Sequence, residues 1–211
     1  MVSVVRGSTF DMESEVVVSL ADMQEFWEKI NSYGRLSDEG RLAWEGILRQ
    51  RTYDKNDFFV QEGQVPRMVA FVSRGLFSQY FCADNGDTVI KRFFPDGYFV
   101  ASTSALLTNS PSVFAIRALE PSVVWEYNFL EFKKLTEKLP EIAGFYIRYL
   151  ELHWVIEKEP LEISFRLDTA KTRYLNFLKS YPKLEPRLKQ HEIASYLGVT
   201  PTQLSRIRSE L

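Results

Sequence analysis

The chain has 211 residues, of which 45% are hydrophobic and 26% are charged, so it can bury a sizeable core and is long enough for two domains. Its apolar runs fall short of the roughly 18 residues that a membrane-spanning helix needs, and Asp11, Glu13 and Glu15 interrupt the segment where a signal peptide would be apolar. The single cysteine, Cys82, excludes a disulfide framework and a four-thiolate iron–sulfur cluster within one chain. We therefore expect a cytoplasmic protein with no membrane partner.

Charge is distributed unevenly along the sequence. The formal net charge is −2, but residues 163–211 contain nine lysines and arginines against four acids, a net charge of +5, whereas the preceding residues carry −7. A basic segment of this kind is typical of a module that meets phosphates. The pattern predicts a basic C-terminal module attached to an acidic module with another role.

Residues 20–51 show helical periodicity at the start of the chain. The residues expected to face inward are Phe26, Ile30, Leu42, Ile47 and Leu48.

Glycines punctuate the middle of the chain at intervals of eleven or twelve residues, at Gly63, Gly75, Gly86 and Gly97. Six runs rich in β-branched and aromatic residues lie around them, at 57–60, 68–72, 76–81, 88–94, 113–119 and 123–127. The dipeptide Asn85-Gly86 is the strongest hairpin signal among them. Short strands with evenly spaced turns predict a small antiparallel barrel or roll.

A second group of helices follows the predicted roll. Asn128 or Phe129 starts a short helix that Pro140 interrupts, and Pro140 suits the first position of a longer helix that bends or breaks at Pro160. This longer helix has a seam spaced by three and four residues, formed by Ile142, Phe145, Tyr149, Leu152 and Ile156. We expect the seam to pair with a second copy, and packing on its own roll is the alternative. A further helix is expected over 168–180, with Tyr174, Leu175 and Leu178 inward, and then a loop over 181–186.

The C-terminal residues 190–208 have the spacing of a helix-turn-helix. Ala194 and Gly198 are the small residues that a close helical turn requires, and Thr200-Pro201 is typical of a helix start. An apolar seam is expected from Ile193, Leu197, Leu204 and Ile207. The residues predicted to contact base edges or phosphates are Lys189, Thr200, Thr202, Gln203, Ser205, Arg206 and Ser209.

In this order the parts resemble the Crp/Fnr family of bacterial transcription regulators, over nearly the whole chain. The most recognisable stretches are 53–63, 94–99, 117–121 and 189–208. The resemblance implies an α+β fold: a sensor domain over 1–160, with an antiparallel β-roll of the cyclic nucleotide-binding type, flanking helices and a dimerisation helix at about 140–160, and a helix-turn-helix domain over 161–211. It also implies a homodimer on roughly palindromic double-stranded DNA, with RNA polymerase as a further candidate partner.

Two departures from the family pattern concern DNA recognition. The position that the family usually gives to a base-reading arginine is Pro201 here, so we expect a different target sequence. Three residues follow Arg208, so we expect a small head without the β-hairpin wing that is usual in the family.

A third departure concerns the cyclic nucleotide. Family members that bind it carry a glutamate for the ribose and, about ten residues later, an arginine for the cyclic phosphate, whereas this chain has Ser102 and Ser112. We therefore expect no cyclic AMP binding. The candidate pocket residues are Phe99, Ala101, Ser102, Thr103, Ser104, Ser112 and Val113. This pocket either binds another small effector, binds nothing, or only fills space.

Enzymatic and metal functions lack the residues they need. The two histidines, His153 and His191, lie on expected helices outside the roll, so neither a haem ligand nor a metal set of the cupin type can form inside it, and both are expected to face solvent. We predict no catalytic residues, no metal site and no certain cofactor. Two functions stay open: a DNA-binding regulator, or a small-ligand-binding or interaction module, cyclic nucleotides included, whose helix-turn-helix does not read DNA.

Overall fold

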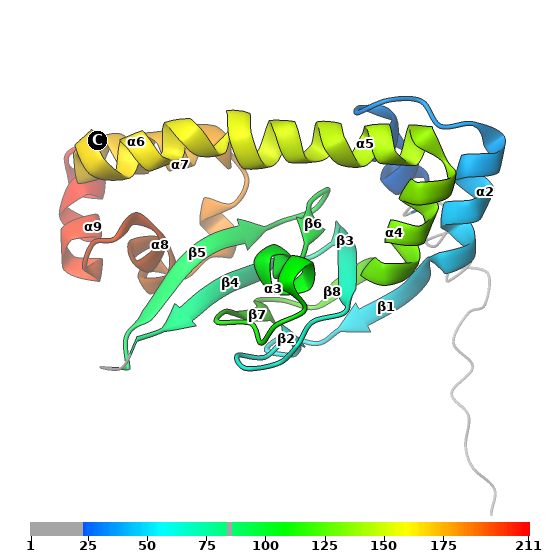
Figure 1. The fold of residues 1–211 in the computed structure, drawn as a ribbon. Helices are drawn as coiled ribbons and strands as arrows, with labels where there is room; N and C mark the ends of the chain where they lie inside the picture. The colour runs from blue at the N-terminus through cyan, green and yellow to red at the C-terminus, as the bar shows by residue number, and fades with distance from the viewer. Residues whose placement is uncertain (1–22, 84–85) are drawn as a thin grey trace, which may run out of the picture.

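The computed structural model describes residues 23–83 and 86–211 and is built around a roll of two four-stranded antiparallel sheets (Figure 1). One sheet has the strand order β1-β8-β3-β6 and the other β2-β7-β4-β5. The strands are β1 (Arg49–Tyr53), β2 (Phe58–Val60), β3 (Met68–Arg74), β4 (Phe77–Cys82), β5 (Thr88–Phe94), β6 (Phe99–Val100), β7 (Ala115–Ala118) and β8 (Ser122–Asn128). Val72, Phe77 and Ile116 are buried in the core of the roll. The predicted antiparallel roll is thus confirmed.

Two strands were not predicted. β1 replaces the end of the helix expected over residues 20–51 and pairs with β8 from Arg49↔Glu126 to Tyr53↔Ser122. Its sequence lacks an apolar alternation because it is an edge strand with mostly exposed side chains. β6 is only two residues long, too short for a periodic signal. The β4–β5 hairpin forms as predicted, although Asn85 lies outside the described residues.

The N-terminal helices cover the sheet that contains β1. Residues 23–31 are helical, and α2 (Asp38–Ile47) begins after Ser37, whose Oγ accepts a hydrogen bond from the Gly40 amide. Phe26, Ile30 and Leu48 are buried as predicted, and Ile47 is half-buried; residues 20–22 lie outside the described part. The prediction for Leu42 is wrong: it is 67% exposed, because Trp44 defines the inner face of α2.

A long helical rod crosses the roll (Figure 1). It follows α4 (Phe129–Lys138) and consists of α5 (Pro140–Leu150), a π-helical segment (Glu151–Ile156) and α6 (Lys158–Leu167). Pro140 is the first residue of α5, as expected. The break predicted at Pro160 is wrong: this proline lies in the first turn of α6, where its missing N–H costs little. The irregularity comes one turn earlier, where the Glu157 amide donates to the Leu152 carbonyl, a π-type bond of 2.9 Å.

The C-terminal head contains α7 (Ala170–Ser180), a 3₁₀ turn (Glu185–Arg187), α8 (Gln190–Leu197) and α9 (Pro201–Ser209). Tyr174 and Phe177 are the buried residues of α7, while Leu178 is half-buried and Leu175 is exposed, contrary to prediction. Residues 181–184 precede the 3₁₀ turn and separate it from α7. Within the described ranges, no helix combines the length and apolarity needed to cross a membrane.

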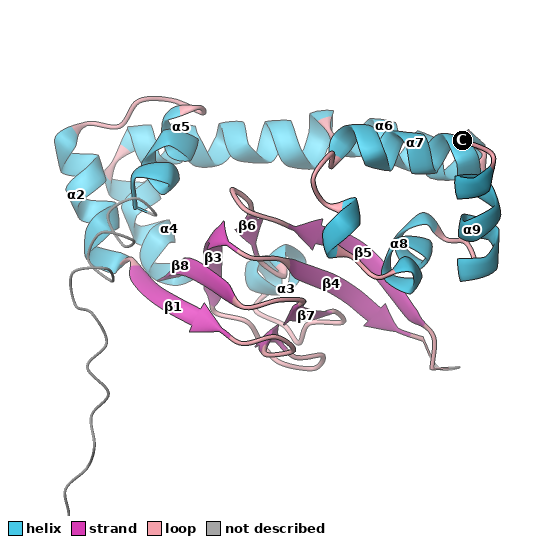
Figure 2. Ribbon diagram, turned by 180° about the vertical axis from the view of Figure 1, so that it is seen from behind, coloured by secondary structure: helices cyan, strands magenta, loops and turns pink. Residues whose placement is uncertain are grey.

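The head and the roll share one hydrophobic core. α8 lies along the outer edge of β5 (Figure 2), and the Ile90 amide donates to Ser195 Oγ at 2.9 Å, so the head satisfies an edge group of the sheet. The shared core includes Leu76, Tyr80, Ile90, Phe93, Leu119, Tyr174, Phe177, Leu184, Ile193, Leu197 and Leu204. The C-terminal head is therefore packed onto the roll through a continuous apolar interface.

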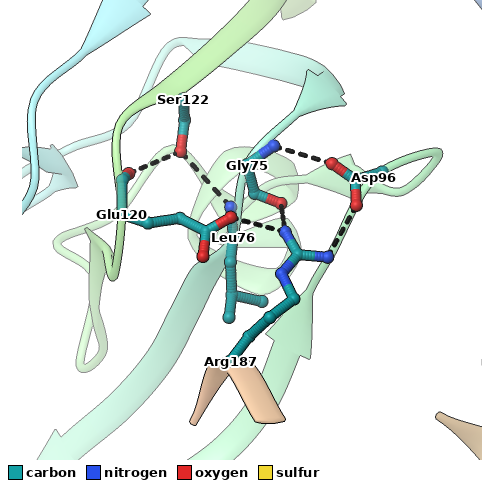
Figure 3. A network of polar contacts seen from close by, with 6 residues as sticks. All are labelled: Gly75, Leu76, Asp96, Glu120, Ser122 and Arg187. Atoms are coloured by element: carbon teal, nitrogen blue, oxygen red, sulfur yellow. Dashed lines mark hydrogen bonds and ion pairs between the residues drawn. The ribbon is translucent and has the colours of Figure 1, made fainter. Parts of the chain in front are cut away.

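Arg187 also joins the head to the roll, through hydrogen bonds and ion pairs of its guanidinium (Figure 3). Its guanidinium donates to Asp96 Oδ2 at 2.7 Å, to Glu120 Oε1 at 2.6 Å and to the Gly75 carbonyl at 2.8 Å. Asp96 Oδ1 in turn accepts from the Gly75 amide at 2.7 Å. The two carboxylates raise the pKa of Arg187 against the opposing effect of burial. One side chain from the head thus links three turns of the roll.

Replacing Arg187 by methionine should lower the free energy of unfolding by about 1 to 2 kcal/mol, because the partly exposed side chain loses three charge-assisted bonds while its apolar stem is kept. Chemical denaturation measures the change. Arg41→Met, which removes an exposed ion pair between successive turns of α2 and a guanidinium 5.1 Å from the Trp27 ring, should cost only about 0.5 kcal/mol. Equal effects of the two substitutions would contradict the role assigned to Arg187.

Gly75→Ala should destabilise the protein by about 3 kcal/mol or more, because Gly75 has a φ of +123° and an added Cβ would lie 2.1 Å from Ser122 Oγ. Gly46→Ala is the matched control: it lies in α2 with open space around it and should stabilise the protein by up to about 1 kcal/mol. Thermal unfolding of both variants measures these effects. An unchanged melting temperature for Gly75→Ala would contradict the close approach of Gly75 and Ser122.

Candidate functional site

The helix-turn-helix forms as the sequence predicts. Gly198 ends α8 in the left-handed region, with a φ of 65°. Thr200 caps α9: its Oγ1 accepts from the Gln203 amide at 3.1 Å, and Gln203 Oε1 accepts from the Thr200 amide at 2.9 Å. The predicted seam of Ile193, Leu197, Leu204 and Ile207 is buried, and so is Ala194.

The predicted DNA-contact residues are all exposed but not equally free. Thr200 and Gln203 are engaged in the cap, and Ser209 Oγ donates to the Arg206 carbonyl at 2.8 Å. Four of these side chains make no hydrogen bond or ion pair with the described residues: Lys189, Thr202, Ser205 and Arg206. The outer face of α9 therefore presents two hydroxyls and one guanidinium to an approaching ligand.

The other arginine of α9 has a structural role. Arg208 Nη2 donates to Glu185 Oε1 at 2.9 Å, and Arg208 Nε donates to Tyr174 Oη at 3.1 Å. Glu185 also accepts from the Tyr174 hydroxyl. Arg208 thus fastens the end of α9 to α7 and the 3₁₀ turn, which leaves Arg206 as the free arginine of the helix.

Two serines occupy the positions at which the sequence resemblance predicts a ribose-binding glutamate and a phosphate-binding arginine in nucleotide-binding relatives. Ser102 and Ser112 are both buried, and their hydroxyls are hydrogen-bonded to each other at 2.8 Å. Ser112 Oγ also donates to the Phe114 carbonyl at 2.7 Å. Ser102 precedes the short helix α3 (Thr103–Thr108), but its side chain does not cap it. Both hydroxyls are satisfied within the protein and offer no cation to a phosphate.

A cavity of about 830 Å³ lies between the roll and the long helix. Of the predicted pocket residues, Phe99, Ala101 and Thr103 line it. Ser104 lies at a separate apolar groove between α3 and the long helix, and Val113 is exposed. Asn176 of α7, Tyr181 just after it and Tyr196 of α8 also line the cavity, so the roll and the head both contribute to it.

Lys91 and Arg92 line the same cavity from β5. Arg92 opposes Gln79 and Ile90 opposes Tyr80, which leaves Lys91 as an extra residue in a β-bulge. Neighbouring side chains of a regular strand point to opposite faces, and the bulge is what allows both cations to reach one cavity. Burial, together with Lys158 and Arg92, lowers the pKa of Lys91.

His153 is not solvent-facing, contrary to prediction. Its Nε2 lies 2.6 Å from the Tyr33 hydroxyl and its Nδ1 lies 2.6 Å from Glu157 Oε2. Burial lowers the pKa of His153, against the opposing effect of Glu157. His191 is exposed, as expected. In the part of the chain that the structure describes, no group of His, Cys, Asp and Glu side chains converges as a metal site would require.

The residues of the predicted dimerisation seam lie in three environments. Ile142 and Phe145 are buried in their own protomer against the N-terminal helices and the roll, and Tyr149 lines the cavity. Leu152 and Ile156 are exposed. Further exposed apolar residues continue along the rod and include Ile147, Val155, Ile163 and Leu167. The apolar surface open to a partner therefore begins at Leu152 and Ile156 and continues along α6 with Ile163 and Leu167.

The sequence contained a signal for the cavity residues that was not used. Lys91-Arg92 separates the apolar pairs Val89-Ile90 and Phe93-Phe94, and two adjacent charges in a strand indicate either solvent or a bulge beside a polar site. The tyrosines gave no such signal, because Tyr98, Tyr181 and Tyr196 lie on separate elements that only the fold brings together.

The comparisons with known proteins agree with this architecture. Residues 50–138 match the model of the cyclic nucleotide-binding domain. Comparison with curated protein sequences gives no match.

Several solved structures are similar over most of the chain. FixK2 from Bradyrhizobium japonicum is 18% identical with a TM-score of 0.67, over 78% of this chain and 84% of that one. A CooA mutant from Carboxydothermus hydrogenoformans is 17% identical with a TM-score of 0.62, over 83% and 80%. The Thermus thermophilus catabolite activator protein is 18% identical with a TM-score of 0.53, over 87% and 86%. The chain thus carries a cyclic nucleotide-binding domain and has the fold of the Crp/Fnr-family transcription regulators.

Proposed function

We propose that the chain is a sequence-specific DNA-binding transcription regulator that acts as a homodimer. The observation that carries the proposal is the outer face of α9, where Thr202, Ser205 and Arg206 are exposed while Arg208 is held by Glu185. A capped, rigid helix with free polar side chains fits a major groove, and Arg206 suits a bidentate contact to guanine. A cytoplasmic location and contact with RNA polymerase belong to the same proposal.

The long helix supports dimerisation with a second copy. Leu152, Ile156, Ile163 and Leu167 are separated by four, seven and four residues and are exposed, the spacing of a coiled-coil seam. An apolar row of this length on a helix is expected to be covered. Twofold pairing along this rod would place two α9 helices on one DNA molecule and match a palindromic site.

The roll is proposed to have lost cyclic-nucleotide recognition. Ser102 and Ser112 stand where glutamate and arginine would hold the ligand, and they are bonded to each other. A buried cyclic phosphate would have no charge-assisted bond at this position. The signal that the roll receives is therefore another one.

Ile156→Glu should weaken self-association at least about tenfold, because a buried, unpaired carboxylate at a seam position costs more than 1.4 kcal/mol. Sedimentation equilibrium of the full chain measures this. The matched control is Leu42→Glu, at an exposed leucine of α2, which should leave the association unchanged. A wild-type monomer at micromolar concentration, or an unaffected Ile156→Glu dimer, would contradict the proposed interface.

Selection from random duplex DNA with the full-length protein tests DNA reading itself. We expect enrichment of a twofold-symmetric sequence whose binding weakens steeply with salt. If no sequence is enriched at low salt, the helix-turn-helix is an adaptor and the regulator proposal fails.

Arg206→Ala should weaken binding to the selected sequence by about 1 to 3 kcal/mol and relax preference at one base pair. Fluorescence anisotropy with labelled duplex measures both. Arg166→Ala, at another exposed arginine of the basic segment but outside α9, should change binding by less than about 0.5 kcal/mol. Unchanged binding of Arg206→Ala would show that α9 is not the reading helix.

A further inference from the structure

Arg92 is a half-buried cation at the cavity without a carboxylate partner. Among residues 23–83 and 86–211 its guanidinium makes no hydrogen bond or ion pair, and its contacts are with the rings of Phe94 at 5.4 Å and Tyr98 at 5.9 Å. Two acids also line the cavity, but Glu157 is bonded to His153 and Glu162 is paired with Lys158 at 3.2 Å. The positive charge of Arg92 is therefore available to a ligand.

The walls around Arg92 are aromatic. Tyr98 and Tyr181 have ring centroids 6.3 Å apart, and Tyr181 and Tyr196 have centroids 6.4 Å apart. Tyr149 and Trp154 line the side formed by the long helix. Burial raises the pKa of Tyr149 to about 12, which keeps this phenol neutral. Flat rings beside an unpaired guanidinium suit a flat ligand with one negative group.

We propose that the cavity binds a small planar organic anion, such as an aromatic carboxylate, with its anionic group at Arg92 and its ring among Tyr98, Tyr181 and Tyr196. The bulge at Lys91, rather than the loop that carries Ser112, supplies two of the cations that line the cavity, and Lys158 and Lys179 supply the others. The ligand class thus differs from a cyclic nucleotide in the position of its charge.

A ligand in the cavity would contact the head as well as the roll, because residues of both line it. Arg92 belongs to the roll, Tyr149 to the long helix, Tyr181 to the turn after α7 and Tyr196 to α8. A ligand that contacts all four would favour one arrangement of the head on the roll. This regulatory role rests on the proposed function, whereas ligand binding does not.

Isothermal titration calorimetry of the full-length protein without DNA tests the binding, with naphthalene-2-carboxylate as the probe and naphthalene-2-carboxamide as its uncharged match. We expect one saturable site per chain with a Kd on the order of 100 μM for the carboxylate, and at least about tenfold weaker binding of the amide. Cyclic AMP should give no measurable binding at micromolar concentration.

Arg92→Gln should weaken carboxylate binding at least about tenfold and leave amide binding unchanged, while Arg92→Lys should keep part of the affinity. The matched control, Arg51→Gln, alters an exposed arginine of β1 and should change neither. Circular dichroism confirms that each variant is folded.

Three results would overturn the proposal: no saturable binding of the carboxylate, equal affinity for the carboxylate and the amide, or carboxylate affinity insensitive to Arg92→Gln. Saturable binding of cyclic AMP would refute the reading of Ser102 and Ser112 instead. The calorimetry contains no DNA, so failure of the ligand proposal would not affect the test of DNA binding by selection.

Discussion

The junction between the head and the roll is the constraint on which the rest of the molecule depends. β5 is an edge strand, and an edge strand needs a cover for its unpaired backbone groups. α8 supplies that cover through Ser195, the shared core excludes water, and Arg187 fixes the rim with Asp96 and Glu120. The direction of α9 follows from this docking, because its seam and Arg208 hold it rigidly to the other helices of the head.

The long helix meets three neighbours along successive segments of its length. Ile142 and Phe145 pack against the roll and the N-terminal helices, Tyr149 and His153 line the cavity, and Ile156 is exposed. The π-helical segment changes the angular spacing of side chains at the point where the rod passes from the N-terminal core to the cavity. One helix can therefore connect the proposed dimer interface, the cavity and the C-terminal head, because each segment of the helix has its own neighbour.

Local chemistry made some features predictable and global packing hid others. Gly198 and the Thr200-Pro201 cap specify the helix-turn-helix within a few residues, and the evenly spaced glycines specify the strands, so both were found from sequence. The inner face of α2 is set by Trp44, which packs against aromatic residues of distant elements. Periodicity alone could not show these contacts and placed Leu42 on the inner face instead. The cavity was missed for the same reason: Arg92 and Tyr196 become neighbours of one site only after the head docks.

If the head and the roll form one cooperative unit, native-state hydrogen exchange should show it. Because α8 covers β5, we expect the outward amide of Ile90 and the amides of α8 to open together, with the same free energy and the same denaturant dependence. Rapid exchange at Ile90, or opening of α8 at a free energy well below that of β5, would show that the head is not held on the roll.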